Sequence, residues 1–263
     1  MKTVVFLGGG RITSAMLAGL RLSRSEERFI VHDRNAAKMR RLQRLYRAIP
    51  EGNLHRAVEH SDLLIVAVRP DSVQALVSEM VEVARPLLAV SVAAGVPLRV
   101  LRRAAGTAVR WARAMPSPVC RSGNGLTAIT FPRTLSLRDR RQVRDLFSAF
   151  GHVIEIPERK FDAFTVTYSS SHGYHALASL AKAAQEIGLD RHTALLAAAH
   201  ALADGIAGWR EGKHSLKFLL EEAATPGGIA ATAMTAVDAA GYARAVRTGL
   251  HAGLRRARAN ARG

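Results

Sequence analysis

The sequence predicts an α/β fold, with a doubly wound sheet in the N-terminal part and an all-helical domain after it. Short apolar runs alternate with amphipathic helical stretches over residues 1–157. From residue 158 onward the chain consists almost entirely of helix-forming residues with an Ala-rich periodicity. A chain of 263 residues is long enough for two modest domains, and we expect these to be residues 1–157 and 158–263.

Short apolar runs bounded by turn residues are expected to form the strands. Their Val, Ile and Leu content is typical of strands buried on both faces of a parallel sheet. The expected strands cover residues 4–7, 29–32, 62–68, 87–92, 108–112, 125–130 and 153–156. Helices are expected over residues 12–22, 36–47, 72–83 and 98–104, and from the capping residue Ser136 to Phe150. This alternation implies right-handed crossover connections.

The second half of the chain is expected to contain only helices. Interruptions are expected at Gly188, across residues 205–212, at Pro226-Gly227-Gly228 and at Gly241. Small Ala and Gly residues at many positions favour close helix packing, and such a domain can bury its faces against a second copy of itself. We therefore expect a dimerisation domain and a homodimer or higher homo-oligomer. The last helix, with Arg255, Arg256, Arg258 and Arg262, is expected to fray.

The composition narrows the expected partners. A net charge of +17 and a pI of about 11.3 raise the question of nucleic-acid binding. However, the arginines are dispersed, and aromatic residues make up only 5% of the chain, which leaves little surface for base stacking. We expect no nucleic-acid partner. The anionic ligands expected are a dinucleotide and a small carboxylate.

The sequence also lacks the features that would indicate a membrane-spanning helix, a disulfide or a metal site. The chain has no run of about 18 uncharged apolar residues, so no transmembrane helix and no membrane partner are expected. A single cysteine, Cys120, excludes an intramolecular disulfide and disfavours a paired-cysteine metal site. The histidines show no ligand spacing, so no metal is expected. A reducing cytoplasm fits this cysteine content.

The glycine turn after the first strand carries the clearest functional signal. Gly8 and Gly10 are followed by Thr13 in the G-x-G-x-x-small pattern, between an apolar strand and a helix. Gly8 permits the tight turn, and Gly10 lets the backbone approach a pyrophosphate. The free N–H groups and the dipole of the helix N-terminus attract phosphate. This arrangement is typical of a Rossmann-type dinucleotide-binding domain.

Two residues after the second strand bear on the choice between NADH and NADPH. Asp33 is placed to accept hydrogen bonds from the adenosine ribose, which favours NAD. Arg34, beside it, is placed to hold a 2′-phosphate, which favours NADP. Arg11, directly after the glycines, is a candidate partner for the pyrophosphate or a plain surface arginine. The sequence leaves both choices open.

Further motifs follow the glycine turn in a fixed order. They are residues 6–20 (FLGGGRITSAMLAGL), 62–71 (DLLIVAVRPD), 91–101, 113–129 (RAMPSPVCRSGNGLTAI), Asp162-Ala163 and 224–230. With these motifs at matching separations, nearly the whole chain resembles the pyrroline-5-carboxylate reductase family, which completes proline synthesis. The resemblance implies an oxidoreductase that transfers hydride from nicotinamide C4 to the carbon of a cyclic imine. The implied substrate is pyrroline-5-carboxylate or a close analogue.

The resemblance also implies which residues bind the two ligands. For the cofactor it adds, to those named above, Ile12, Ala67, Val68, Arg69, Pro70, Ala94, Met115 and Pro116. For the substrate it implies Ser117, Ser170, Thr225, Pro226, Gly227 and Gly228. The backbone N–H groups and the hydroxyl of the 225–228 loop suit a carboxylate.

The chain departs from the family where the resemblance places the substrate. Tyr168–Tyr174 reads YSSSHGY in place of SGSGPAY, and Ala230 replaces the threonine that hydrogen-bonds the substrate nitrogen. His172 is the side chain best able to donate a proton near neutral pH, and His172 or Tyr168 is expected to replace the missing donor. A structural role in the serine-rich turn is the alternative for His172. The catalytic candidates are therefore His172, Tyr168 and Thr225.

Two other functions remain open at this point. β-Hydroxyacid dehydrogenases share the architecture, but they carry a catalytic lysine on the long interdomain helix. Lys182 lies too far along the expected helix to match it. The missing threonine also suggests a non-catalytic dinucleotide-binding regulatory protein.

Overall fold

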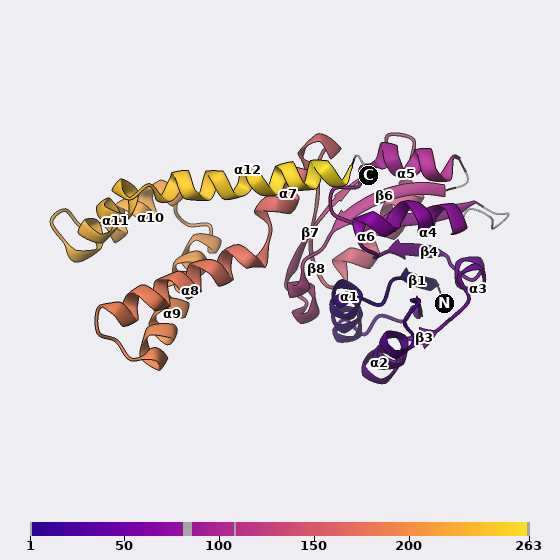
Figure 1. Cartoon of the computed structure of the whole chain (residues 1–263), viewed down its shortest axis with the longest axis horizontal. Coiled ribbons are helices and arrows are strands. Elements are labelled where there is room, and N and C mark those ends of the chain that lie inside the picture. The colour runs from indigo at the N-terminus through magenta and orange to yellow at the C-terminus, as the bar shows by residue number, and fades with distance from the viewer. Residues whose placement is uncertain (1, 81–85, 108, 262–263) are drawn as a thin grey trace. The chain divides into compact units, whose positions relative to one another are not determined.

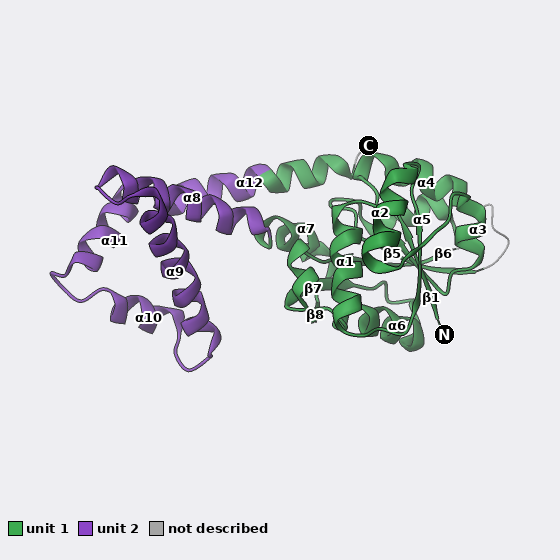
Figure 2. Ribbon diagram, turned by 90° about the horizontal axis from the view of Figure 1, so that it is seen from below, with its two compact units in different colours: residues 1–168, 253–263 green, residues 169–252 purple. Residues whose placement is uncertain are grey.

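The computed structural model describes residues 2–80, 86–107 and 109–261. The chain separates into two compact units, residues 1–168 with 253–263 and residues 169–252 (Figure 2). The first unit holds the sheet and the second is all-helical, so the predicted fold class is confirmed. Residues 158–168 group with the sheet by their contacts, and the predicted boundary after residue 157 stays a prediction.

An eight-stranded sheet forms the centre of the first unit (Figure 1). Its strands are β1 (Thr3–Leu7), β2 (Arg28–His32), β3 (Ile49–Pro50), β4 (Leu63–Val66), β5 (Leu87–Ser91), β6 (Val109–Met115), β7 (Gly125–Thr130) and β8 (Gly151–Glu155). The spatial order is β3-β2-β1-β4-β5-β6-β7-β8, and neighbours are parallel except for β6 and β7. The direction of winding reverses between β1 and β4, which is where ligands bind in open α/β sheets.

Helices cover both faces of this sheet because alternate strand residues point to opposite sides. One core contains Val4 and Phe6 of β1 and is covered by α1 (Arg11–Leu22), α2 (Ala36–Tyr46) and α6 (Leu137–Ser148). The other contains Val5 and Leu7 and is covered by α3 (Leu54–Glu59), α4 (Val73–Met80) and α5 (Leu98–Ala105). The same strand thus supplies both cores.

The first unit differs from the expected one in β3, in α3 and in the direction of β7. β3 and α3 were not expected, because two residues and six residues are too short to give a periodic signal. β7 runs antiparallel to β6, because the link through the 3-10 turn η2 (Pro118–Ser122) is too short for a parallel crossover. Residues 81–83 of the expected fourth helix and Ala108 of the expected strand lie outside the described residues. The expected N-cap Ser136 accepts a hydrogen bond from the backbone N–H of Asp139.

The second unit is built from α8 (Ser170–Glu186), α9 (Arg191–Arg210), α10 (Leu216–Ala223), α11 (Ile229–Ala239) and the first part of α12 (Tyr242–Asn260). α8 packs against α9, and the small residues Ala181, Ala194 and Ala198 are buried there. α9 continues through Gly205 and Gly208, so the interruption expected from residue 205 begins only after Arg210. A glycine inside a long helix is tolerated when the flanking residues favour the helix.

The end of α12 is docked, which corrects the expectation that it frays. The Asn260 side-chain amide donates to the carbonyl oxygen of Ala94 at 3.2 Å, and Ala257 is buried. Gly95 lies so close to the Ala257 carbonyl that a Cβ at residue 95 would clash with it. Arg262 lies outside the described residues. None of the helices in the described part of the chain is long and apolar enough to cross a membrane.

Candidate functional site

The glycine turn between β1 and α1 leaves an open backbone surface. Gly8 has a φ of +110°, and a Cβ there would lie 2.6 Å from the Ala67 carbonyl oxygen. A Cβ at Gly10 would meet no described heavy atom within 4 Å. α1 then begins at Arg11 with no side-chain cap, and it has no acidic residue in its first turn. The backbone N–H groups of this first helical turn are therefore placed to bind an anion such as a pyrophosphate.

Thr13 takes the position where the pattern prefers a smaller residue. Its side chain is fully buried, and its Oγ1 donates a hydrogen bond to the Gly8 carbonyl oxygen at 2.5 Å. The hydroxyl therefore has a partner inside the core, which removes the cost of burying it. Thr13 ties α1 to the glycine turn, a contact that the spacing alone does not reveal.

Asp33 supports the glycine turn from the end of β2. Its Oδ2 accepts the backbone N–H of Gly9 at 2.7 Å, and its Oδ1 accepts the N–H of Asn35 at 2.8 Å. The Lys38 ammonium lies 3.4 Å from Oδ2. Burial by itself raises the pKa of the Asp33 carboxyl, but the two backbone hydrogen bonds and Lys38 outweigh it, and the pKa lies below its ordinary value. Asp33 is thus ionised and holds the turn in place through these hydrogen bonds.

A pocket of about 950 Å³ extends from the glycine turn past the end of β2. Seven of the residues predicted to bind the cofactor line this pocket: Gly8, Gly10, Asp33, Arg34, Ala67, Val68 and Arg69. The sequence reasoning missed others in its lining: His32, Asn35, Ala36, Ala37, Lys38, Arg40, Ser72 and Glu79. The signal that points to them is the N-cap Asn35, which accepts from Ala37 and Lys38 and brings the first turn of α2 to the pocket.

Cationic side chains stand around the Asp33 end of this pocket. Arg34 is 81% exposed and its guanidinium lies 3.3 Å from Glu79 on α4. Lys38 is half exposed, and Arg40 is exposed on α2. Because exposed ion pairs are weak, Arg34 can reorient from Glu79 toward a more highly charged anion.

The residues predicted for the cofactor beyond the glycine turn follow parallel strands that end at one edge of the sheet. Ala67–Pro70 follow β4, Ala94 follows β5, and Pro116 follows β6. The buried Ser91 hydroxyl accepts the N–H of Ala93, which shapes the turn before Ala94. Gly8 follows β1 at the same edge. The structure thus brings these predicted cofactor residues to one edge of the sheet. Arg11 and Ile12 lie in the first turn of α1, directly after the glycine turn.

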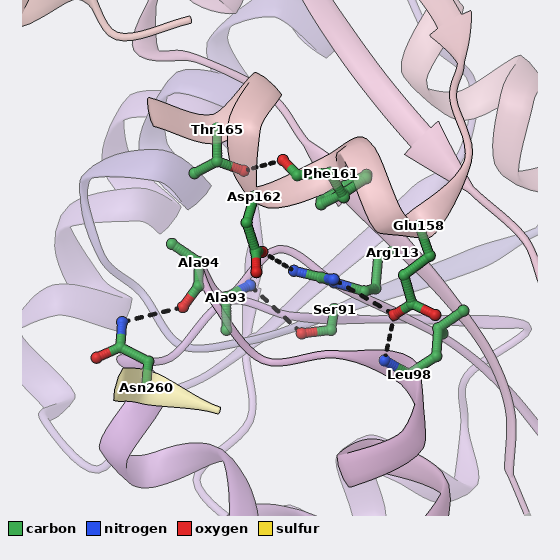
Figure 3. Close-up of polar contacts among 10 residues, drawn as sticks. All are labelled: Ser91, Ala93, Ala94, Leu98, Arg113, Glu158, Phe161, Asp162, Thr165 and Asn260. Atoms are coloured by element: carbon green, nitrogen blue, oxygen red, sulfur yellow. Dashed lines mark hydrogen bonds and ion pairs between the residues drawn. The ribbon is translucent and has the colours of Figure 1, made fainter. Parts of the chain in front are cut away.

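A buried arginine joins β6 to α7 (Glu158–Thr167) at this edge, as Figure 3 shows. Arg113 is 1% exposed and forms ion pairs of 3.3 Å with both Glu158 and Asp162. Its guanidinium also lies 4.3 Å from the centre of the Phe161 ring. Glu158 accepts the backbone N–H of Leu98 at 2.6 Å as well. The cluster fixes the first turn of α7 to the sheet.

Tyr168 follows α7 and holds its other end. The Tyr168 hydroxyl oxygen accepts the backbone N–H of Leu126 at 2.8 Å and the Ser117 hydroxyl at 3.3 Å. Ser117 is buried and accepts the N–H of Val119 at 3.2 Å. The structure therefore brings together two predicted residues, Ser117 and Tyr168. Leu126 was missed, because its contribution is a backbone group.

The other predicted residues lie in the helical unit. Ser170 begins α8, and His172 is exposed in its first turn. Thr225–Gly228 form the turn before α11, in which Gly227 has a φ of +76° and the Gly228 N–H donates to the Thr225 carbonyl. Ala230 lies in the first turn of α11 and is exposed. The roles of these residues stay predictions.

Neither metal binding nor a reactive thiol is supported by the geometry. Among the described residues, no group of three His, Cys, Asp or Glu side chains is placed to hold a metal ion. Burial raises the pKa of the Cys120 thiol to about 12, so the sulfur is protonated and inert at neutral pH.

Comparison with known proteins links both parts of the chain to one group of enzymes. Residues 158–260 match the model of the pyrroline-5-carboxylate reductase dimerisation domain, and residues 3–95 match one described as NADP oxidoreductase, coenzyme F420-dependent. The chain is 31% identical over 218 residues to a pyrroline-5-carboxylate reductase of Mycobacterium leprae, covering 79% of this chain and 73% of that one. It is 30% identical over 261 residues to that of Thermus thermophilus, covering 94% and 93%.

Solved structures show the same fold. The chain matches the pyrroline-5-carboxylate reductase of Streptococcus pyogenes with a TM-score of 0.89 and 21% identity, covering 98% of both chains. It matches the pyrroline carboxylate reductase of Plasmodium falciparum, a structure with NADP bound, with a TM-score of 0.88 and 18% identity, covering 99% and 98%.

Proposed function

The chain belongs to the pyrroline-5-carboxylate reductase family, and on that basis we propose that it reduces pyrroline-5-carboxylate, or a close cyclic imine, with a nicotinamide cofactor. The observation that carries the proposal is the open glycine turn in a chain that matches this family along most of its length. The enzyme is then an NAD(P)-dependent oxidoreductase acting on a C=N bond. Family membership argues against the β-hydroxyacid dehydrogenase alternative.

The residues of the first unit fit a dinucleotide. A Cβ at residue 8 would clash with Ala67, whereas the surface at Gly10 is open and the first turn of α1 is uncapped. Gly10, Arg11 and Ile12 would hold the pyrophosphate through backbone N–H groups. The Gly8 N–H donates to the His32 carbonyl oxygen at 2.7 Å, so Gly8 would shape the turn. The nicotinamide cofactor, when bound, supplies the hydride. Ala67–Pro70, Ala94, Met115 and Pro116 would orient it at the ends of β4, β5 and β6.

We propose NADPH as the preferred cofactor, on the charge of the pocket. An adenosine ribose would donate its hydroxyls to the Asp33 carboxylate, each oxygen of which already accepts one backbone N–H, from Gly9 and from Asn35. Arg34, Lys38 and Arg40 place positive charge in the same pocket. A 2′-phosphate is paired best by such a group of cations. This arrangement supports NADPH over NADH.

For the substrate, we propose the residues that the family resemblance implies. Thr225, Pro226, Gly227 and Gly228 would hold the carboxylate with backbone N–H groups and a hydroxyl, and Ser117 and Ser170 would border it. Positioning two reactants in this way can lower a barrier by about 7–11 kcal/mol. Since Ala230 has no hydroxyl, the proton for the imine nitrogen must come from elsewhere.

Self-association follows from the match to a dimerisation domain, and we propose a homodimer as its smallest form. The exposed apolar side chains of residues 169–252 support this proposal. A cytoplasmic location stays a prediction from the single cysteine, and the absence of a nucleic-acid partner stays one from composition.

The first experiment is oxidation of NADPH or NADH by the purified protein with pyrroline-5-carboxylate. We expect turnover with both cofactors and a higher kcat/KM with NADPH. Related cyclic imines, with and without a carboxylate, test the substrate class in parallel. NADPH binding without reduction of any imine would contradict the proposal and support the non-catalytic alternative.

A further inference from the structure

We propose that Tyr168 donates the proton to the imine nitrogen, and that Ser117 and the Leu126 backbone hold it for this task. The proposal rests on the imine reductase function above and names the donor that this chain uses. The sequence left His172 and Tyr168 as alternatives. The hydrogen bonds around the Tyr168 hydroxyl distinguish them.

The Tyr168 oxygen acts as an acceptor toward the protein. It accepts the Leu126 N–H at 2.8 Å and the Ser117 hydroxyl at 3.3 Å. The Ser117 oxygen in turn accepts the Val119 N–H at 3.2 Å, so its own proton is directed to Tyr168. A phenolic hydroxyl has one proton to donate and lone pairs to accept with. Within the described chain that proton has no acceptor, which leaves it available to a ligand.

Tyr168 lies at the edge of the sheet that the cofactor would occupy. Ser117 follows β6, whose partner β5 runs parallel to it, and Leu126 is the second residue of β7. The carboxyl ends of β1, β4, β5 and β6 share this edge, and the cofactor of an open α/β sheet binds there. The hydroxyl is thus on the nicotinamide side of the sheet, away from the Asp33 pocket beside β2.

The surrounding structure holds the ring still. Arg113 fixes the first turn of α7 through Glu158 and Asp162, and Tyr168 is the residue that ends this helix. The Phe164 ring lies 5.3 Å from the Tyr168 ring between centroids. The Tyr168 side chain is half-buried, so its hydroxyl is restrained and still reachable. A preorganised donor needs these properties. His172, by contrast, is exposed in the first turn of α8.

In the proposed step, hydride and proton are added to the two ends of the C=N bond. The imine carbon accepts the hydride and forms a C–H bond, while the π-electron pair of the C=N bond moves to nitrogen. Nitrogen forms an N–H bond as the phenolic O–H bond of Tyr168 breaks. The imine is reduced, the nicotinamide is oxidised, and the phenolate regains a proton from water. An imine already protonated in solution needs no such donor.

Tyr168→Phe tests the proposal through its pH profile. The variant keeps the ring that contacts Phe164, and we expect its kcat/KM to stay within about threefold of wild type in acid, where the imine is protonated in solution. Above neutral pH we expect a loss of about 10²-fold, the usual contribution of a general acid. Ser117→Ala should show a smaller loss with the same pH dependence.

Two further readouts separate donation from a structural role. NADPH affinity, measured by fluorescence, should change little in Tyr168→Phe. The melting temperature is expected to fall because the Leu126 N–H loses its acceptor, but a loss of stability alone would not confine the loss of kcat/KM to alkaline pH. Tyr46→Phe is the matched control, since its hydroxyl lies 3.1 Å from the Ser14 hydroxyl in the core between α1 and α2. Its pH profile should follow wild type.

The possible results are distinguishable. An equal loss at every pH in Tyr168→Phe would overturn the donor role. So would an alkaline loss in His172→Asn with none in Tyr168→Phe. If the wild-type protein reduces no imine with either cofactor, the proposed function itself fails, whatever the variants do.

Discussion

At the scale of single residues, Asp33 and Arg34 are the two candidates that the sequence offered for the adenosine ribose and for a 2′-phosphate, and the structure gives them different surroundings. Asp33 holds the glycine turn through Gly9 and the start of α2 through Asn35. The pKa of Asp33 lies below its ordinary value because these hydrogen bonds and Lys38 outweigh the effect of burial, so the carboxylate is ionised at neutral pH. Arg34 is exposed at the pocket, and within the described part of the chain its guanidinium pairs with the exposed Glu79. The proposed preference for NADPH therefore rests on Arg34 and its cationic neighbours.

Replacing Arg34 by Ala should raise the KM for NADPH by about tenfold to 100-fold, because a hydrogen bond to a charged group contributes about 1.5–3 kcal/mol. The KM for NADH should change less than threefold, since NADH has no 2′-phosphate. Steady-state kinetics with each cofactor measure both values.

Arg138→Ala, an exposed arginine on α6, is the control for the loss of one positive charge from the surface. It should leave both KM values unchanged. Equal losses with NADPH and NADH in Arg34→Ala would contradict a 2′-phosphate role and indicate a contact to the pyrophosphate instead.

At the scale of elements, α7 is fixed to the sheet at both ends. Arg113 anchors its start and the Tyr168 hydroxyl anchors the residue after its end. The Nε atom of Arg113 is buried and has no hydrogen-bond partner among the described residues. The buried guanidinium is held instead by its ion pairs with Glu158 and Asp162 and by the Phe161 ring.

Arg113→Met should lower the free energy of unfolding by about 3 kcal/mol, because Glu158 and Asp162 then lose their shared cation. The value is at the lower end for a buried pair, since both carboxylates are partly exposed. Urea denaturation followed by circular dichroism gives the comparison.

Arg144→Met is the matched control, because it breaks a 2.7 Å ion pair with Glu155 in which both side chains are exposed. Exposed pairs contribute about 0–1 kcal/mol. Similar losses in the two variants would show that the burial of Arg113 adds nothing.

At the scale of the whole molecule, the helical unit lacks an apolar core of its own. In residues 169–252 the buried apolar side chains are the three alanines between α8 and α9. Large apolar residues of the same unit are exposed, among them Leu195, Leu196, Ile206, Trp209, Leu216, Phe218, Leu220 and Val237. So much exposed apolar surface marks an interaction site, and the family match identifies the partner as a second copy.

Leu196→Glu combined with Ile206→Glu should therefore weaken self-association, because charges would be buried in the interface without partners. Sedimentation velocity should show a smaller species than wild type at the same concentration. Leu137→Glu changes an apolar residue on α6 that is 83% exposed, and it should leave the assembly unchanged. An unchanged assembly in the double variant would place the interface on other helices.

The sequence by itself determined the features that depend on local order. Strand runs, the Ser136 cap, the flanks of the glycine turn and the helical second half follow from periodicity and from where glycine and proline stand. Six collinear motifs were enough to identify the family, since matching spacing over most of a chain is rare by chance.

Only the tertiary structure decided the features that join distant segments. Three such features have no periodic or compositional signal in the sequence. They are the antiparallel direction of β7, the docking of Asn260 on Ala94 and the hydrogen bond from Leu126 to Tyr168. Asp33 could be recognised from its place after β2, but only the structure shows that Gly9 and Asn35 use both of its oxygens. Such contacts depend on which chain segments meet in space, and a backbone N–H group is the same in every residue except proline.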